Sequence, residues 1–220
     1  KEGSYYHNYR DSNISTYVQA AEYLAEQGIW VLRMGKIAEE PIPSQHPKII
    51  DYAFYSEKND LLDIWLFANC YFCISTGSGP DAISNVYQRP MMKVNENPIS
   101  HLNSWSNCIT VPKYLVWEKN GKLLTLRELL QHNYYDLRQY EQAGIRCKDL
   151  SSHEIKEAVK ERLERLNGTW VEQREDNNLQ KRYWEQFKAW PNFSEYHGWI
   201  HPQARMGSHF LRKMGTAFYD

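Results

Sequence analysis

The sequence predicts an α/β protein in which a Rossmann-like parallel sheet carries helices on both faces and is followed by a helical C-terminal tail. Short apolar runs alternate with helical segments in the first half of the chain, which is typical of parallel strands joined by helical crossovers. From residue 151 onward the pattern is helical and rich in tryptophan. We therefore expect a Rossmann-like domain over residues 1–150 and a helical extension over 151–220. The extension is expected to pack on that domain or on a further half of the protein.

The composition is that of an ordinary globular protein and excludes several functional classes. The 220 residues are 42% hydrophobic and 24% charged, with 26 basic against 27 acidic side chains. Nucleic-acid binders usually carry a basic excess, so we expect no nucleic-acid partner. No apolar run is long enough to cross a bilayer. The chain opens on Lys1 and not on Met, which indicates a fragment or a trimmed chain.

The first helix and the first two strands follow one another over residues 14–53. Apolar residues recur at helical spacing over 14–25, and Gly28 provides a stop signal. The run IWVLR over 29–33 is a short buried strand. Three prolines and a glycine make 34–47 a loop. The segment 48–53 is the second strand candidate.

Two further strands frame the part of the sequence that carries most of the functional signal. Asp60 is expected to cap a helix, and the apolar residues 71–74 form the third strand. A glycine-rich turn follows, and Pro80 suits the first position of a helix that reaches about Gln88. Residues 91–94 form the fourth strand. The turn therefore lies at the carboxyl end of a parallel strand.

Residues 96–150 are expected to be mixed in secondary structure, and the tail that follows is expected to be helical. A short strand is predicted at 108–111, with helical turns at 125–131. Ser151 and Glu154 form a capping box that opens a helix with one apolar face. The later helices are expected at 172–189 and 203–214.

The four cysteines are expected to be reduced core thiols. Cys70 and Cys73 form a C-x-x-C pair, which could indicate a redox or zinc site. No second pair follows, and both residues lie in an apolar segment where free cysteine behaves as a small hydrophobe. The two remaining cysteines, Cys108 and Cys147, are isolated. We expect neither a metal nor a cofactor.

The loop after the third strand is the main candidate binding element. In open α/β sheets, ligands bind at the carboxyl ends of the strands, and bare N–H groups at a helix N-terminus favour an anion such as a diphosphate. Asp81 follows in the first helical turn, where it either stabilises the helix dipole or holds sugar hydroxyls. The alternative interpretation of the loop is a tight strand-to-helix turn with no ligand. The loop residues are Ser75, Thr76, Gly77, Ser78 and Gly79.

Cations are expected at the same edge of the sheet. Arg33 ends an apolar strand and can bind two phosphate oxygens with its fork of donors, while Lys36 can act as a point charge. The alternative for each is a surface salt bridge. Asn95, His101 and Trp105 follow the fourth strand and could line the far wall of a pocket.

The first residues and several missing motifs complete the functional signal. The cluster of Tyr5, Tyr6, His7, Tyr9, Arg10 and Asp11 is either a binding loop or a mobile chain end. The sequence lacks a P-loop, a full G-x-G-x-x-G, an H-E-x-x-H, a G-x-S-x-G and a D-x-D cluster. The absence of D-x-D argues against a metal-bound nucleotide-sugar site.

The chain resembles a family of bacterial glycosyltransferases associated with surface-polysaccharide synthesis. The matching stretches run from Tyr9 to about Trp170, with weaker likeness near GSHFLRKMG. They are YRDSNISTY, AAEYLAEQG, VLRMGK, HPKIIDYA, LLDIWLFANCYFCISTGSG, RPMMKVN and LNGTW.

The resemblance implies the donor-binding, C-terminal half of a fold with two facing Rossmann-like lobes, the type called GT-B. Arg33 and Lys36 would then stabilise the departing diphosphate of a nucleotide-sugar without a metal, and the loop at 75–79 would cradle it. Tyr52 and Ala53 would lie where the base sits, and Asn95 would line the donor site. The acceptor would be a glycan or a lipid-linked sugar, and the protein would be cytoplasmic or attached to the inner membrane surface.

Two alternatives to a transferase stay open from the sequence. One is a nucleotide-sugar epimerase or hydrolase of the same architecture. The other is a non-catalytic module that binds a nucleotide or docks a protein partner through its tryptophan-rich tail. The acceptor half, the catalytic base and the stereochemical outcome cannot be read from these residues.

Overall fold

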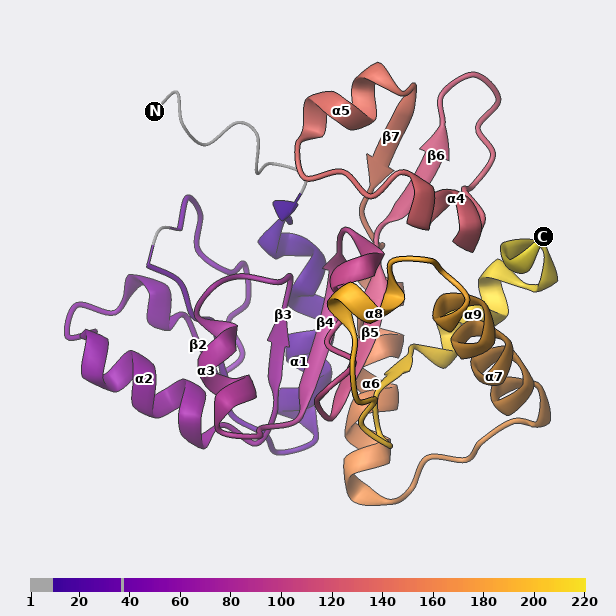
Figure 1. Ribbon diagram of the computed structural model, residues 1–220. Helices are drawn as coiled ribbons and strands as arrows, with labels where there is room; N and C mark the ends of the chain where they lie inside the picture. Colours follow the sequence, from indigo (N-terminus) through magenta and orange to yellow (C-terminus); the bar gives the residue numbers. More distant parts are fainter. Residues whose placement is uncertain (1–9, 37) are drawn as a thin grey trace.

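The computed structural model describes residues 10–36 and 38–220 and shows an α/β protein built on a four-stranded parallel sheet (Figure 1). The sheet has the order β3-β4-β5-β8, and every neighbouring pair is parallel. Helices flank it, which is consistent with the Rossmann-like class predicted above. Its strands are β3 (Cys73–Ser75), β4 (Met91–Glu96), β5 (Cys108–Pro112) and β8 (Arg205–Met206).

The first two predicted strands form a separate pair. β1 (Val31–Leu32) and β2 (Ile49–Ile50) are parallel and bonded to each other, and within the described residues neither belongs to the four-stranded sheet. Both strands are shorter than the sequence predicts. The expected second strand in particular ends early, because the chain turns into the 3-10 helix η3 (Tyr52–Phe54).

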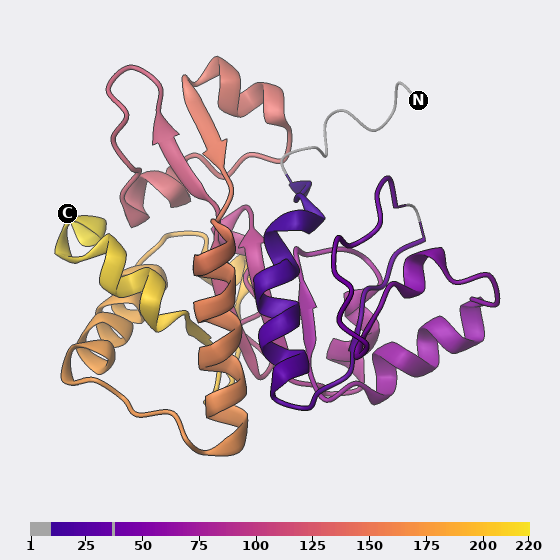
Figure 2. The same ribbon diagram turned by 180° about the vertical axis from the view of Figure 1, so that it is seen from behind.

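Helices cover both faces of the four-stranded sheet. α1 (Val18–Glu26) and α6 (Ser152–Asn167) lie side by side on one face, which is turned toward the viewer in Figure 2. α3 (Asp81–Val86) lies on the opposite face and packs against α2 (Asp60–Asn69). The predicted arrangement of helices on two faces is therefore present.

Local capping explains where the helices begin. The side chain of Ser151 accepts a hydrogen bond from the Glu154 N–H, and the Glu154 carboxylate accepts from the Ser151 N–H at 2.8 Å, so the predicted capping box is formed. The cap of α2 is one residue earlier than predicted. Asn59 Oδ1 accepts from the Leu62 N–H at 2.9 Å, and Asp60 is the first helical residue.

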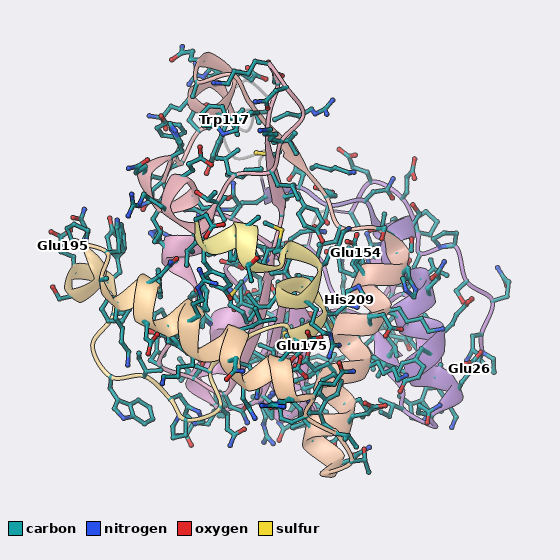
Figure 3. The ribbon with its side chains drawn as sticks, turned by 90° about the vertical axis from the view of Figure 1, so that its right-hand side faces the viewer. Glu26, Trp117, Glu154, Glu175, Glu195 and His209 are labelled. Carbon is teal, nitrogen blue, oxygen red and sulfur yellow. The ribbon has the colours of Figure 1, made fainter. Side chains whose placement is uncertain are left out.

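An antiparallel hairpin stands at the carboxyl edge of the sheet and was not predicted. β6 (Tyr114–Trp117) pairs with β7 (Ile145–Lys148), and two short helices join them. The hairpin with Trp117 forms the upper part of the molecule in Figures 1 and 3. The joining helices are α4 (Leu126–Gln131), at the predicted position, and α5 (Leu137–Gln142).

The C-terminal tail is not purely helical. A helix was expected from Gln203 to Met214, but β8 comes first and adds a strand to the parallel sheet beside β5. The tail helices are α7 (Arg174–Lys188), α8 (Phe193–Tyr196) and α9 (Ser208–Met214). The remaining 3-10 turns are η2 (Ile14–Tyr17), η4 (Ile99–His101) and η5 (Thr216–Tyr219). Among the described residues, no helix combines the length and the hydropathy needed to cross a membrane.

The cysteines are free thiols, as expected. Cys73 and Cys108 are buried with Met91 in a small apolar cluster, and Cys70 and Cys147 are half buried. Burial raises the pKa of the Cys73 thiol to about 12 and that of Cys108 to about 11. These thiols therefore stay protonated at neutral pH and behave as packing groups.

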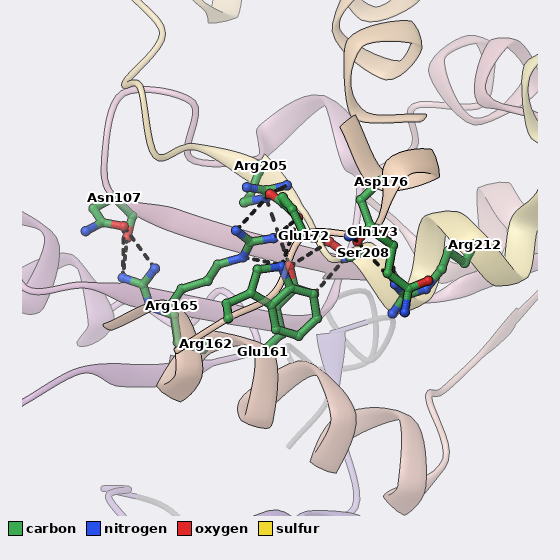
Figure 4. A network of polar contacts seen from close by, with 11 residues as sticks. Asn107, Glu161, Arg162, Arg165, Glu172, Gln173, Asp176, Arg205, Ser208 and Arg212 are labelled. Carbon is green, nitrogen blue, oxygen red and sulfur yellow. Dashed lines mark hydrogen bonds and ion pairs between the residues drawn. The ribbon is translucent and has the colours of Figure 1, made fainter. Parts of the chain in front are cut away.

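A buried ion network joins the tail to the sheet (Figure 4). Glu161 on α6 is fully buried, and its carboxylate accepts hydrogen bonds from the N–H and the hydroxyl of Ser208, at 2.7 and 2.8 Å. Arg165 donates to the same carboxylate at 2.9 Å and forms two bonds with Glu172. Arg205 on β8 pairs with Glu172 at 3.0 Å. The carboxylates of Glu161 and Glu172 together thus fix α6, β8 and α9 against one another.

Glu154 makes a second link between α6 and α9. It accepts from the Tyr114 hydroxyl at 2.6 Å and from the Lys213 ammonium at 2.5 Å. Figure 3 shows Glu154 where α6 begins, next to α9. Partial burial alone would raise the pKa of this carboxyl, but the bonds from Lys213, Tyr114 and Ser151 hold the pKa at about 2. It stays ionised in its three-way contact throughout the neutral range.

Replacing Glu161 by Ala should lower the free energy of unfolding by about 3 kcal/mol, because breaking a buried ion pair leaves Arg165 and Ser208 short of an acceptor. Arg165 and Arg205 keep Glu172, so the loss is expected at the lower end of the usual range for such pairs. Urea denaturation followed by circular dichroism measures the change.

The matched control for that substitution is Glu185→Ala on α7. Glu185 is a helical glutamate with a mostly exposed side chain that pairs with Lys181 at 3.8 Å. Exposed helix pairs contribute only about 0.5 kcal/mol or less. Similar losses in the two variants would show that Glu161 does not anchor the tail.

Candidate functional site

A cavity of about 640 Å³ lies between β1 and β3 and reaches the carboxyl ends of both strands. Its volume falls within the usual range for small-molecule sites, about 300–1,000 Å³. Apolar side chains line its interior: Ala20, Ala21 and Leu24 from α1, Leu66 and Phe67 from α2, Val31 and Leu32 from β1, and Phe72 and Ile74 beside or within β3. Most of its polar lining lies where β1 and β3 end, and this end of the cavity is called its mouth below. The polar residues there are Arg10, Asp11, Ser12, Arg33, Ser75, Thr76, Ser78 and Asp81.

Arg33 lines this cavity directly after β1, and its charge is already paired. Its Nη1 lies 3.1 Å from Asp51 Oδ1, and the guanidinium lies over the ring of Phe54 at 5.5 Å from the centroid. Asp51 also accepts from the Ile42 N–H at 2.7 Å. The guanidinium is therefore held in a fixed direction at the mouth. An incoming anion would share it with Asp51.

The hydroxyl of Ser75 organises the glycine-rich loop. It donates to Asp81 Oδ2 at 2.5 Å and accepts from the N–H groups of Gly77 and Ser78 at 3.1 and 3.4 Å. Gly77 has φ +83°, a conformation that glycine adopts without the steric penalty of a side chain. Two of the loop amides are thus turned toward Ser75, whereas Thr76 and Ser78 present their side chains to the cavity.

Beneath the loop lies a buried ion cluster of Asp81, Lys93 and Glu96. The Lys93 ammonium is 3.0 Å from Asp81 Oδ2 and 3.6 Å from Glu96 Oε2. All three side chains are almost fully buried, and Glu96 Oε2 makes no hydrogen bond in the described structure. Two carboxylates therefore share one ammonium in a site with little water.

The protonation of this cluster follows from the excess of two carboxylates over one ammonium. Burial raises the pKa of Glu96, and the neighbouring Asp81 carboxylate adds to the rise, although Lys93 and Arg10 oppose it. Burial alone would lower the pKa of Lys93, but Glu96 and Asp81 raise it above its ordinary value. Lys93 therefore stays charged, and Glu96 takes up a proton more readily than an exposed glutamate does.

The helix that follows the loop is shorter than predicted. The sequence suggested a helix from Pro80 to about Gln88, but α3 covers only Asp81–Val86, and Gln88 adopts φ 54°. A helix of this length has a small macrodipole. Any stabilisation of an anion at the loop would therefore come from side chains and loop amides more than from the helix.

The other predicted site residues do not line the cavity. Lys36 is exposed just after Arg33, whereas Tyr52 and Ala53 are buried in η3. Asn95 is fully buried, and its side chain joins three parts of the chain. It donates to the Ser12 hydroxyl at 2.7 Å and accepts from the Leu150 N–H at 2.8 Å.

Gly77 and Gly79 do not line the cavity either, and Gly79 is exposed at the end of the loop. The two residues expected on the far wall of the pocket also have other surroundings. His101 Nε2 forms a hydrogen bond with the Tyr135 hydroxyl at 2.7 Å, and Trp105 is half exposed. Neither lines the cavity. Phe54 and Tyr55, next to the predicted pair at 52–53, are the exposed rings of this region.

Sequence reasoning missed the buried cluster and only partly identified the N-terminal segment. Lys93 lies within β4 between Met92 and Val94, and Glu96 ends the same buried strand. A buried strand is an unusual place for two charges, and this is the signal that could have revealed them. Arg10 and Asp11 line the cavity mouth. The other residues of that cluster, at positions 5–7 and 9, lie outside the described residues.

In comparisons with known proteins, no family model, no curated protein and no solved structure matches this chain. A search of the described residues for three or more His, Cys, Asp or Glu side chains that could hold a metal ion also finds no group.

Gly77→Ala should destabilise the protein by about 1–3 kcal/mol, because a non-glycine residue is strained at positive φ. The added Cβ would also lie 2.8 Å from Glu96 Oε2. Gly79→Ala is the matched control, since its Cβ would meet no atom within 4 Å. Equal melting temperatures for the two variants would contradict the close packing of the loop at 75–79 against the ion cluster of Asp81, Lys93 and Glu96.

Glu96→Gln should become more stable relative to the wild type as the pH rises from about 4 to 8. The raised pKa of Glu96 means that the folded state binds this proton more tightly than the unfolded state, so the carboxyl costs stability once the pH exceeds the unfolded pKa of about 4.3. Glutamine does not ionise, so the variant does not lose this stability as the pH rises.

Thermal melts of the wild type and the variant across that pH range measure the effect. Groups that titrate in the same way in both proteins do not contribute to the difference between their melting temperatures. Each kcal/mol corresponds to roughly 2–4 °C at this chain length. A difference that is constant with pH, or that favours the wild type at high pH, would show that Glu96 has no raised pKa.

Proposed function

We propose that this protein is the donor-binding half of a metal-independent glycosyltransferase that moves a sugar from a nucleotide-sugar to a glycan or lipid-linked acceptor. One observation carries the proposal. A single cavity at the carboxyl ends of parallel strands joins the Arg33 guanidinium to the hydroxyl-bearing loop at 75–79. In open α/β sheets this is the position at which nucleotide ligands bind.

In this proposal Arg33 neutralises the negative charge that develops on the departing nucleoside diphosphate. Its guanidinium can bind two oxygens of a phosphate while the Asp51 contact keeps it in place. Thr76 and Ser78 offer hydroxyls to the phosphate or the sugar. Lys36, exposed beyond Arg33, would add a second positive charge.

The protonation state of Glu96 in the buried cluster affects how well an anionic ligand can bind above it. With Glu96 ionised, two carboxylates and one ammonium lie under the loop, and the net negative charge opposes a diphosphate. Protonation of Glu96 removes that charge. We therefore expect diphosphate binding to strengthen as the pH falls toward the range in which Glu96 binds a proton.

A screen of nucleoside diphosphates by thermal shift tests the proposal. A ligand at about 100 times its Kd stabilises the native state by about 2.7 kcal/mol. At this chain length that corresponds to a rise of roughly 5–10 °C. Arg33→Ala should abolish the rise while the protein stays folded, and should lower sugar transfer about 10²–10³-fold.

The matched control is Arg182→Ala, which removes a partly exposed arginine that pairs with Asp220 far along the tail. It should keep the full thermal shift. Sugar release to water with no acceptor would instead indicate a hydrolase. The absence of a shift with every nucleoside diphosphate, or an unchanged shift in Arg33→Ala, would refute the proposed donor site.

A further inference from the structure

Two hydroxyl groups on the wall of the cavity, those of Ser12 and Tyr17, are held together by one buried amide. Their oxygen atoms lie 3.0 Å apart, and both residues line the cavity. The side chain of Asn95 contacts both: its Nδ2 lies 2.7 Å from Ser12 Oγ and 3.4 Å from the Tyr17 hydroxyl. Asn95 is fully buried and does not line the cavity. It can therefore act on a ligand only through these two hydroxyls.

The direction of the Asn95 amide is fixed by the main chain. Its Oδ1 accepts a hydrogen bond from the Leu150 N–H at 2.8 Å. A main-chain N–H is a donor only, so the amide oxygen must face Leu150 and the NH2 group must face the two hydroxyls. Asn95 is therefore a donor toward Ser12 and Tyr17, and neither hydroxyl can donate to its NH2 group in return.

The backbone at Asn95 links this hydroxyl pair to the buried ion cluster. Asn95 has φ 56° and lies where the register of β4 with β5 shifts between Val94 and Glu96. In a regular strand, residues three apart point to opposite faces, yet Lys93 and Glu96 meet at 3.6 Å. A bulge re-aims side chains in this way. The same residue therefore holds the hydroxyl pair and turns Glu96 toward the cluster under the loop.

A count of hydrogen atoms leaves the hydroxyl pair with one donor to spare. Ser12 and Tyr17 each carry one hydroxyl hydrogen. One of these two forms the bond between the hydroxyls, whichever of them is the donor. Within residues 10–36 and 38–220, no acceptor takes the second hydrogen, since Asn95 only donates to the pair. The second hydrogen is therefore free to point into the cavity that both side chains line.

The pair keeps its hydrogens at neutral pH. Burial raises the pKa of the Tyr17 hydroxyl above its ordinary value, and the Asp149 carboxylate adds to the rise, although the bonds with Ser12 and Asn95 oppose it. A serine hydroxyl does not ionise in this range. The cavity wall thus offers a neutral donor and not an oxyanion, so the group that it suits on a ligand is a hydrogen-bond acceptor.

We propose that Ser12 and Tyr17 form a donor subsite for a phosphate oxygen and that Asn95 is the positioning residue that orients the pair. The subsite deepens the proposed function and rests on it in taking a diphosphate as the ligand. Hydrogen bonds to a charged oxygen are stronger than those between neutral groups, so the spare donor discriminates in favour of an anion.

The charges around the mouth agree with an anionic ligand. Arg10 and Arg33 line the same cavity as the hydroxyl pair. Of the two acids there, Asp81 belongs to the ion cluster, and Asp11 lies next to Lys113, whose ammonium donates to the Asp11 carbonyl at 2.7 Å. A phosphate oxygen at the subsite would therefore have cations nearby as well as a donor.

The spare hydrogen predicts an unusual response to substitution. In Ser12→Ala the Tyr17 hydroxyl keeps a hydrogen for the ligand, and in Tyr17→Phe the Ser12 hydroxyl does so. Only the double variant has no donor left. We expect the Kd of a nucleoside diphosphate, measured by isothermal titration calorimetry, to rise about twofold or less in each single variant and at least about tenfold in the double variant.

The matched control is the double variant Ser15→Ala, Tyr23→Phe. Neither residue lines the cavity, and the Ser15 hydroxyl donates to Asn13 Oδ1 at 2.7 Å. This control should keep the wild-type Kd. A tenfold loss in either single variant would overturn the shared donor. Equal binding by the wild type and the Ser12/Tyr17 double variant, with binding still abolished by Arg33→Ala, would overturn the subsite and leave the donor site standing.

Nuclear magnetic resonance of the wild-type chain covers the case in which the double variant does not fold. Inorganic pyrophosphate, which carries neither base nor sugar, is titrated into the ¹⁵N-labelled chain, followed by the nucleoside diphosphates. An oxygen that accepts from the pair polarises the bonded hydroxyls, so the side-chain NH2 signals of Asn95 should shift. Those of Asn120, exposed in the hairpin, should not.

The outcomes separate the two proposals. A shift of the Asn95 signals with pyrophosphate, but no binding of any nucleoside diphosphate, would support the subsite and refute the nucleotide-sugar donor. Asn95 signals that stay in place with pyrophosphate and with every nucleoside diphosphate would overturn the subsite.

Discussion

The candidate site depends on one buried ammonium, that of Lys93, which lies between the carboxylates of Asp81 and Glu96. Buried charges are costly unless they are paired, so this lysine fixes the position of both acids. Asp81 in turn binds the Ser75 hydroxyl, and that hydroxyl holds the turn at Gly77. The carboxyl ends of β3 and β4 and the start of α3 are thereby locked together under the loop that faces the cavity.

A second network performs the same task at the opposite side of the sheet. Glu161 brings α6 and α9 together, and Glu172, in the segment before α7, extends the contact to Arg205 on β8. Because β8 adds a strand next to β5, the C-terminal tail is part of the sheet and not an appended layer. The tail stabilises the end of the sheet that lies farthest from β1 and β3. The cavity side depends on α1, α2 and the ion cluster.

Several elements could be predicted because their signals are local. The capping box at Ser151 and Glu154 opens α6 as expected. The apolar runs at 91–94 and 108–111 lie within β4 and β5, and the run at 71–74 overlaps β3. The hairpin β6–β7 was missed because its strands are separated by about thirty residues that contain two short helices, so no turn signal links them. β8 has only two residues, which is too short for any periodicity to reveal.

The sequence by itself determined the α/β class, the order of most helices and strands, and the location of Arg33 and the loop at 75–79 after parallel strands. Those features follow from hydrophobic periodicity and from residues that act on their immediate neighbours. Only the tertiary structure decided that Arg33 pairs with Asp51, that Asn95 and Tyr52 are buried, and that Lys93 and Glu96 form an ion cluster. It also decided that β1 and β3 face each other across a cavity. Each of these depends on groups far apart in the chain, whose charges and main-chain donors meet only when the sheet and its helices are packed.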